Sequence, residues 1–378
     1  MNFQRKLGRN DPCWCGSNMK YKWCHLGRES ELPWTRSEAL QAFRKSFERK
    51  YCLFPRSSDC NGNIVRAHSI QESMLRKIAR DGKVYHFKPG LATLLSNHGV
   101  PKASLVGIND ASTFTGFCSF HDDKVFAPLE KNSLVFSNEQ LFLLHYRAIC
   151  RELFTKKAAS ESNIGLTQAD RGKSLAEQVD HQIRLHDNSI WTEAGLRDIQ
   201  AAKAICDSML LASDFSAIGY LVIPISQIPE VACSGAFFPD YDFAGNQLQD
   251  LSDLDQKLDP VSFSIVPTEK GGAVVITWIG DTDACKRFGE SFLDSAKGDV
   301  GKVAVRMAFD FENLFISPTW WDAVSTELKE KIASRIRTNA NILINRSRNY
   351  LSEEWVDLPV SWGSLVHADV LKKTGNRL

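Results

Sequence analysis

The sequence contains no long uninterrupted run of apolar residues. A membrane-spanning helix needs roughly 18 such residues in a row, whereas the apolar segment AIGYLVIPI covers only residues 217–225. We interpret this segment as a buried strand. The first residues, MNFQRKLGRNDPC, also lack the apolar centre of a signal peptide. These absences predict a cytoplasmic protein with no membrane segment and no membrane partner.

The signature motifs of several large enzyme classes are missing as well. There is no Walker loop, no G-x-G-x-x-G after a predicted strand, no G-x-S-x-G and no kinase signature. The paired glycines Gly271 and Gly272 lack the following helix that would hold a phosphate. The sequence therefore argues against an ATPase, a dehydrogenase or a serine hydrolase.

Charge is nearly balanced overall but unevenly distributed. Residues 1–130 carry 20 Lys and Arg against 12 Asp and Glu, a difference of +8, and the remainder carries 26 against 33, a difference of −7, which together give the net +1. A basic front part indicates a polyanionic partner, either nucleic acid or an acidic protein or ribosomal surface. A surface that is merely uneven is the alternative.

Disulfides are not expected among the ten cysteines of a protein in a reducing compartment. Six cysteines lie within the first 118 residues, in tight groups or beside histidines. The other four stand singly in apolar or helical segments, and we expect them to be buried as small apolar side chains: Cys150, Cys206, Cys233 and Cys285.

The first group of cysteines has the spacing of a closed zinc site. Cys13 and Cys15 can bind one side of the ion, and Cys24 and His25 can return to the other side. The segment Gly16-Ser17-Asn18 supplies the tight turn that this short excursion needs. Because so few residues cannot form a core, the metal would have to stabilise the fold.

The segment GRNDPCWCGSNMKYKWCH, residues 8–25, resembles the SEC-C motif, GRNDPCPCGSGKKYKKC(C/H). It departs from that motif at Trp14, at Asn18-Met19 and at Trp23, none of which is a ligand position. The resemblance implies that Cys13, Cys15, Cys24 and His25 bind Zn²⁺. It also implies a bacterial protein that docks on a secretion chaperone, a ribosome or another protein, because the best-known SEC-C motif does so at the end of the preprotein-translocation ATPase.

A second group of potential ligands lies further along the chain. Cys52 and Cys60 flank a turn, a predicted strand over residues 63–70 follows, and Cys118 and His121 open a predicted helix. Ser69 is expected to cap a helix over residues 71–80. The four ligands would close one zinc site in a knuckle, hairpin and helix arrangement, a treble clef.

Residues 50–130 also resemble the zinc-stapled HNH nucleases in the order of these parts. Carried over by position, the resemblance implies that His68 is the general base and that Asp122 helps to hold a catalytic Mg²⁺ or Mn²⁺. Three features depart from that family. Ala67 stands where an aspartate precedes the histidine, seven residues rather than two separate Cys52 from Cys60, and the only candidate for the middle asparagine, Asn109, lies further upstream. A purely structural zinc module, with His68 simply hydrogen-bonded inside it, is the alternative.

The remaining sequence changes from a helical to a strand pattern. A capped helix is predicted from Ser137, and helices continue to about residue 213. Apolar alternation then predicts strands at 217–226, 232–239, 261–267, 272–280 and 302–310, before a final helix over 320–350.

These patterns together predict an α+β multidomain protein. The predicted segments are a zinc knob (residues 1–28), a treble-clef or HNH-like zinc module (34–130), a helical region (131–215) and an α+β domain with a mainly antiparallel sheet (216–378). We expect a cytoplasmic zinc protein that engages nucleic acid through its basic front part. The resemblance to HNH nucleases implies metal-dependent cleavage, which would make the protein a candidate antiviral defence effector. The alternative is a non-enzymatic adaptor that docks through its knob.

Overall fold

The computed structural model describes residues 7–87, 101–339, 347–353, 355, 357–363 and 370–375. The chain divides into two compact units, each built from two separate stretches. Unit 1 comprises Met1–Arg49 with Thr155–Leu196, and unit 2 comprises Lys50–Phe154 with Arg197–Leu378. Within the described ranges no helix has both the length and the apolar character to cross a membrane.

Unit 1 contains the knob, one short helix and the adjoining parts of two long helices. The knob carries the 3₁₀ turns η1 (Tyr21–Trp23) and η2 (Arg28–Ser30), and α1 spans Arg36–Phe47. Thr35 and Glu38 cap α1 reciprocally, since the Thr35 hydroxyl accepts from the Glu38 N–H at 3.2 Å and the Glu38 carboxylate accepts from the Thr35 N–H at 2.8 Å. The long helices α5 (Asn138–Leu166) and α6 (Leu175–Ala212) confirm the helices predicted from Ser137 to about residue 213, and each helix is shared between the two units.

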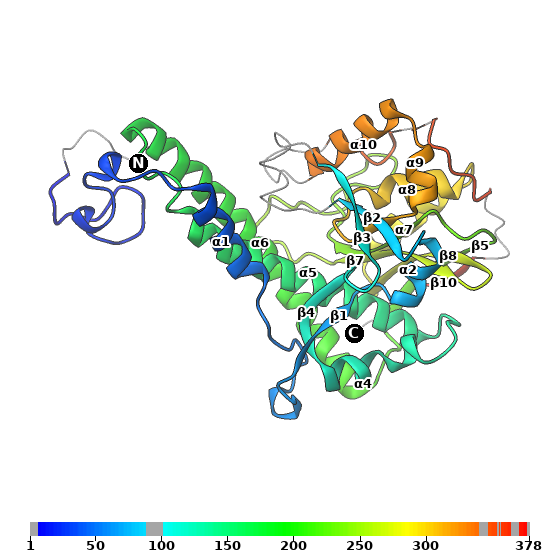
Figure 1. The fold of residues 1–378 in the computed structure, drawn as a ribbon. Coiled ribbons are helices and arrows are strands. Elements are labelled where there is room, and N and C mark those ends of the chain that lie inside the picture. The colour runs from blue at the N-terminus through cyan, green and yellow to red at the C-terminus, as the bar shows by residue number, and fades with distance from the viewer. Residues whose placement is uncertain are drawn as a thin grey trace. The chain divides into compact units, whose positions relative to one another are not determined.

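Unit 2 is built around a large antiparallel sheet (Figure 1). Within the described ranges it has eight strands in the order β10-β5-β8-β7-β6-β9-β2-β3. Their bounds are β2 Lys83–Phe87, β3 Ala103–Gly107, β5 Ile218–Ile225, β6 Val231–Phe237, β7 Val261–Thr268, β8 Gly271–Ile279, β9 Leu314–Ile316 and β10 Leu371–Lys373. The turn from β7 to β8 requires glycine, because Gly271 has a φ of +142° and a Cβ there would lie 2.1 Å from the Ile225 carbonyl oxygen.

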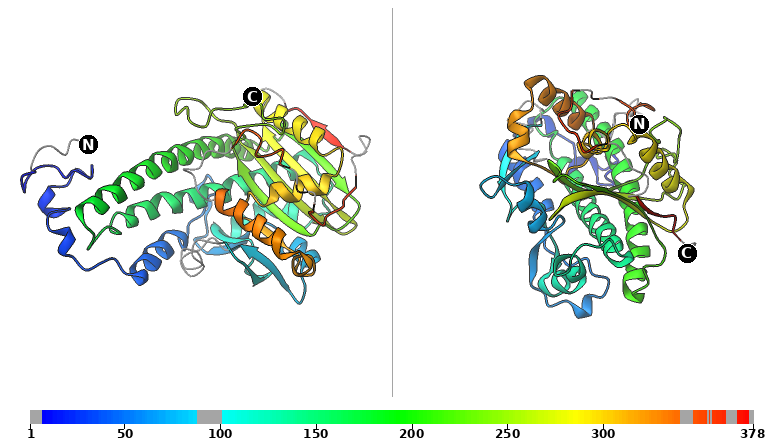
Figure 2. Two further views of the ribbon diagram at one scale, coloured as in Figure 1. Left: turned by 90° about the horizontal axis from the view of Figure 1, so that it is seen from above. Right: turned by 90° about the vertical axis from the view of Figure 1, so that its right-hand side faces the viewer.

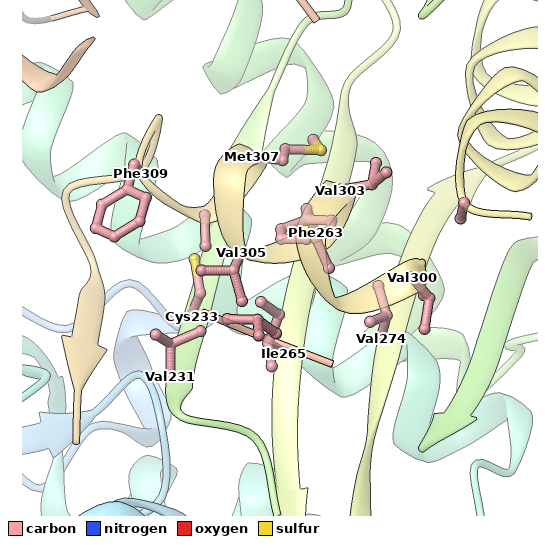
Figure 3. Packing of buried hydrophobic residues seen from close by; sticks show 14 of the residues in the cluster. Val231, Cys233, Phe263, Ile265, Val274, Val300, Val303, Val305, Met307 and Phe309 are labelled. Atoms are coloured by element: carbon pink, nitrogen blue, oxygen red, sulfur yellow. The ribbon is translucent and has the colours of Figure 1, made fainter. Parts of the chain in front are cut away.

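Alternation along the central strands gives the sheet two different faces. Phe263 and Ile265 of β7 point toward α7 (Asp283–Ser295) and α8 (Val300–Ala308), and they form one apolar core with those helices (Figure 3). Ser262 of β7 faces the opposite way and contacts His145 of α5. The sheet of unit 2 therefore lies between the two sets of helices, as the edge-on view shows (Figure 2). The four single cysteines are buried, which confirms that prediction: Cys150, Cys206, Cys233 and Cys285.

The second zinc module is a smaller layer of unit 2. Strands β1 (Ile64–His68) and β4 (Thr113–Cys118) pair antiparallel, and α4 (Ser119–Glu130) follows β4 directly. The segment that holds α2 (Glu72–Ile78), β2 and β3 is inserted between β1 and β4 along the chain. A mixed fold with an antiparallel sheet and two zinc-type modules confirms the predicted fold class.

Two predicted elements and one predicted cap were wrong. Residues 302–310, predicted as a strand, belong mainly to α8, because Asp299 caps this segment by accepting from the Gly301 and Lys302 N–H groups at 2.9 and 3.3 Å. The final helix divides into α9 (Pro318–Ala323) and α10 (Thr326–Asn339), and residues 340–346 lie outside the described ranges. Ser69 does not cap α2, since its hydroxyl donates to the Ser112 carbonyl at 2.9 Å.

The buried His145 makes unit 2 sensitive to acid. Burial lowers the pKa of His145 to about 4, whereas an unfolded histidine titrates near 6.5. Below pH 6.5 the unfolded chain binds a proton that the folded chain does not, so stability decreases as the pH falls toward 4. We expect a loss of about 2 kcal/mol between pH 7.5 and 5.0 from this group. Hydrogen exchange of the β7 and β8 amides at both pH values, in the wild type and in His145→Gln, measures it, and an equal pH response of the two proteins would contradict it.

Candidate metal centres

The first group consists of Cys13, Cys15, Cys24 and His25, and its ligand atoms lie within 4.8 Å of one another. A tight turn brings them together: Gly16 and Asn18 adopt left-handed backbone conformations with φ of 80° and 58°. The Cys13 N–H then donates to the Met19 carbonyl at 2.8 Å, which closes the loop. The predicted turn at residues 16–18 is thus the element that positions the sulfurs.

The chemistry of this group suits a zinc ion. The His25 ring presents Nδ1 to the sulfurs, 3.2 Å from Cys13 Sγ and 3.1 Å from Cys24 Sγ. Burial raises the pKa of the Cys13 thiol to about 12, a shift that a bound cation reverses because zinc ligates the thiolate. Three cysteine sulfurs and one imidazole nitrogen form a donor set that Zn²⁺ prefers. The group can hold a metal ion, consistent with zinc.

A carboxylate far along the chain supports the histidine of this group. His25 Nε2 lies 3.0 Å from Asp170 Oδ2, and Asp170 is fully buried in unit 1. Arg28 and Gln182 also donate to the Asp170 carboxylate, each at 2.6 Å. Although burial raises the pKa of Asp170, these hydrogen bonds outweigh it and lower the pKa to about 2. A carboxylate behind a ligating imidazole fixes its tautomer and orientation.

Sequence reasoning missed Asp170 and Gln182. Asp170 stands 145 residues after His25, and no cysteine or paired ligand spacing marks its segment. The pairing depends on the helical parts of unit 1 packing against the knob, and no local pattern encodes that. Arg28 lies in the basic front part of the sequence, yet its side chain is buried against Asp170.

The second group contains Cys52, Cys60, Cys118 and His121, whose ligand atoms also lie within 4.8 Å of one another. Cys118 ends β4 and His121 lies in the first turn of α4, so the strand-to-helix junction sets their spacing. His121 Nδ1 is 3.2 Å from Cys118 Sγ and 3.5 Å from Cys52 Sγ. Phe54 stacks on the His121 ring with a centroid separation of 3.8 Å. This group can hold a second metal ion.

The two histidines differ in their outer contacts. In the described part of the chain, His121 Nε2 is buried without a hydrogen-bond partner, whereas His25 Nε2 has Asp170. Burial lowers the pKa of His121, which favours the neutral form that ligates metal. The second site therefore depends on its ligands and on packing, and the first depends also on a charged network.

The two predicted catalytic residues lie in the second zinc module. His68 ends β1 opposite Thr113, and its Nε2 lies 3.4 Å from the Ile108 carbonyl oxygen. Asp122 follows His121 in α4. Its Oδ1 is buried and has no partner among the described residues, and burial raises the pKa of Asp122 to about 6. Within those residues no hydrogen bond joins His68 to Asp122 and neither belongs to a metal group, so their catalytic roles stay a prediction.

The SEC-C motif family model matches residues 9–27, which confirms the resemblance at the first group. The protein translocase subunit SecA of Chloroflexus aggregans is 68% identical over 28 residues, 7% of this chain and 3% of that protein. The methionine aminopeptidases of Chlamydia trachomatis and Chlamydia muridarum are 53% and 31% identical over 77 residues, 20% of this chain and 24% of each. The chain thus spans at most a quarter of the length of these relatives. No solved structure matches it.

Proposed function

We propose that this is a bacterial, cytoplasmic zinc protein that engages nucleic acid and cleaves phosphodiester bonds at its second zinc module. The observation that carries the proposal is the position of His68. It ends a strand of the antiparallel β1–β4 pair, and this pair leads directly into the zinc-ligating helix α4. An antiviral defence effector is the setting in which we expect such a nuclease to act.

The contact that His68 makes suits a general base. A neutral imidazole has one N–H donor and one bare nitrogen. If Nε2 donates to the Ile108 carbonyl, 3.4 Å away, Nδ1 is left to accept a proton from water. No partner for Nδ1 occurs among the described residues.

Asp122 offers the oxygen ligand that a second, catalytic ion would need. Mg²⁺ and Mn²⁺ bind carboxylate oxygens, and Asp122 Oδ1 is a buried carboxylate oxygen without a partner in the described chain. Such an ion would polarise the phosphate when bound. Burial raises the pKa of Asp122, and the positive charge of Arg147 counteracts part of this effect. Arg147 therefore favours the charged form of the Asp122 carboxyl group.

The surface beside this module suits a nucleic acid strand. Phe120, in the first turn of α4, is 44% exposed, and Lys124 Nζ lies 5.3 Å from its ring centroid. An exposed aromatic ring with a lysine beside it can stack a base and attract a phosphate. The excess of +8 in residues 1–130 adds a non-specific attraction.

Cleavage assays test the proposal directly. Plasmid DNA and total RNA are incubated with the purified protein and Mg²⁺ or Mn²⁺, beside the variants His68→Ala and His186→Ala. We expect cutting that falls by about 10²- to 10⁴-fold in His68→Ala, because a general base contributes that much. His186 is an exposed histidine of α6 in unit 1, so His186→Ala should cut like the wild type. Zinc content, measured on each protein, must be unchanged.

Two results would overturn the nuclease. One is the absence of cutting on every substrate with either ion. The other is equal cutting by the wild type and His68→Ala at equal zinc content, which would leave the second module structural.

One observation favours a second candidate, a non-enzymatic adaptor. Unit 1 contains a cleft of about 660 Å³ between the knob and the helices α5 and α6. Trp23 and Ile164 line it and are 73% and 72% exposed. Large exposed apolar side chains of this kind mark protein interaction sites.

Salt dependence separates the two candidates. Binding through about six phosphates should weaken by about 10³-fold or more between 50 and 200 mM salt. Docking through Trp23 and Ile164 should be nearly insensitive to salt. Affinity for nucleic acid that ignores salt would therefore favour the adaptor.

A further inference from the structure

Unit 2 contains a cleft of about 400 Å³ that neither zinc site uses. Helices α5 and α6, the end of β8 and the segments before β7 and α7 form its walls. Its lining includes four residues with polar side chains that face no zinc site: His145, Lys257, Asp259 and Thr282. Its volume lies within the range of about 300–1,000 Å³ that is typical of small-molecule sites.

His145 is a fully buried group with one unused nitrogen. Its Nδ1 lies 3.2 Å from both the Ser262 and the Thr277 hydroxyl oxygens, which are 2.5 Å from each other. These contacts fix the ring from the sheet side. Its Nε2, on the other side of the ring, is buried and has no partner in the described chain. Leaving a buried nitrogen without a hydrogen-bond partner is unfavourable, so this position calls for a bound group.

A second unused polar atom lies on the same cleft. Thr282 is the residue that precedes the first turn of α7, yet its side chain makes no capping hydrogen bond. Its Oγ1 is buried and, apart from the Cys285 thiol beside it, has no hydrogen-bond partner among the described residues. A hydroxyl can both donate and accept, so His145 and Thr282 together offer two fixed hydrogen-bonding positions.

Asp259 supplies a half-buried carboxylate to the cleft. Gln249 holds its main chain on both sides, accepting from the Asp259 N–H at 2.7 Å and donating to the Asp259 carbonyl at 3.1 Å. The main chain at Asp259 is therefore held in place beside the cleft. A carboxylate has two oxygens that accept hydrogen bonds, which matches two adjacent hydroxyl groups.

The charges of the cleft balance. Lys257 and Asp259 both line the cleft and carry opposite charges. The other acidic residue of the lining, Asp281, pairs with Lys286. Burial keeps His145 uncharged at neutral pH, because it lowers the pKa to about 4. An uncharged ligand fits this balance better than an anion or a cation. Apolar side chains complete the walls: Ala202, Ile205, Pro260 and Ile279.

We propose that this cleft binds a small uncharged ligand with a vicinal diol on a sugar ring, either a free sugar or a nucleoside. Asp259 accepts from the two adjacent hydroxyls, and His145 Nε2 and Thr282 Oγ1 bond other polar groups of the ligand. The apolar walls cover the carbon face of the ring. This site is independent of the proposed nuclease, since no residue of the zinc module lines it.

Calorimetric titration of the full-length zinc-loaded protein tests the site. The probes are D-ribose, D-glucose, adenosine and 2′-deoxyadenosine, each at millimolar concentration. Binding of ribose or glucose identifies a free sugar, and binding of adenosine alone identifies a nucleoside. We expect 2′-deoxyadenosine, which lacks the diol, to bind about 10-fold more weakly or worse than adenosine, because a hydrogen bond to a charged group is lost.

Variants locate the binding. Asp259→Asn and Thr282→Val should each weaken binding of the best probe by about 10-fold or more. Asp255→Asn changes an exposed acid of the same loop that does not line the cleft, and it should bind like the wild type. No binding of any diol probe to the wild type would overturn the proposal. Equal affinity for adenosine and its 2′-deoxy analogue, or equal affinity of all variants, would also overturn it. The comparison of the two nucleosides uses only the wild type and therefore does not depend on the folding of any variant.

Discussion

Removal of zinc is expected to release two metal equivalents and to unfold two local regions while the large sheet of unit 2 stays folded. One region is the knob, and the other is the module of β1, β4 and α4, since each contains one group of four ligands. Structural zinc contributes about 10–16 kcal/mol to the folding of isolated zinc-finger peptides. The large sheet has its own apolar core and needs no metal.

Metal analysis and hydrogen exchange before and after chelation measure this effect. Cys13→Ser and Cys118→Ser should each retain one zinc, and each should lose protection only in its own region. Cys285→Ser is the matched control, because Cys285 is a buried free cysteine outside both groups. A wild-type protein that binds one zinc or none, or a chelated protein with unchanged exchange, would contradict the prediction.

Replacement of Asp170 by asparagine is expected to weaken zinc binding at the first site by about 10- to 100-fold, the usual effect of removing the partner of a ligating histidine. It also leaves the Arg28 side chain, only 5% exposed, without its charge partner, at a cost of about 3–5 kcal/mol. The knob should therefore lose folding stability as well as affinity for the metal.

Competition with a chelator in the Cys118→Ser background measures the first site alone. Asp180→Asn is the matched control, because Asp180 forms an exposed ion pair with Arg184 on the same helix and such pairs contribute about 0–1 kcal/mol. Equal zinc affinity in Asp170→Asn and Asp180→Asn would show that the carboxylate does not support the ligand.

Local chemistry made the two Cys/His groups predictable. The close spacing of Cys13 and Cys15, and of Cys118 and His121, is set by a turn and by a helix start, and the structure gathers both groups. Strands β5 to β8 were predictable for a similar reason, because their apolar runs end at Gly, Pro or Ser. The prediction failed where two patterns compete. The Val-Ala-Val segment of α8 is typical of a strand, but the cap that Asp299 provides favours a helix.

Long-range pairings could not be predicted from the sequence. Asp170 reaches His25 across 145 residues, and Ser69 bonds to Ser112 and to Asn313 instead of capping a helix. Both depend on how elements pack after they form. The roles of His68 and Asp122 belong to the same class, because shared membership of one module does not fix where two side chains meet.

The two-part construction of unit 1 has a consequence for synthesis on the ribosome. The four potential metal ligands of the knob are synthesised before Asp170 and Gln182, and Asp170 follows His25 by 145 residues. A nascent chain can therefore load its metal early, but the histidine acquires its carboxylate only after β1, β4 and α4 have already left the exit tunnel. We therefore expect the first site to form in two stages, metal binding and then pairing of His25 with Asp170. A fragment that ends before residue 170 can complete only the metal-binding stage.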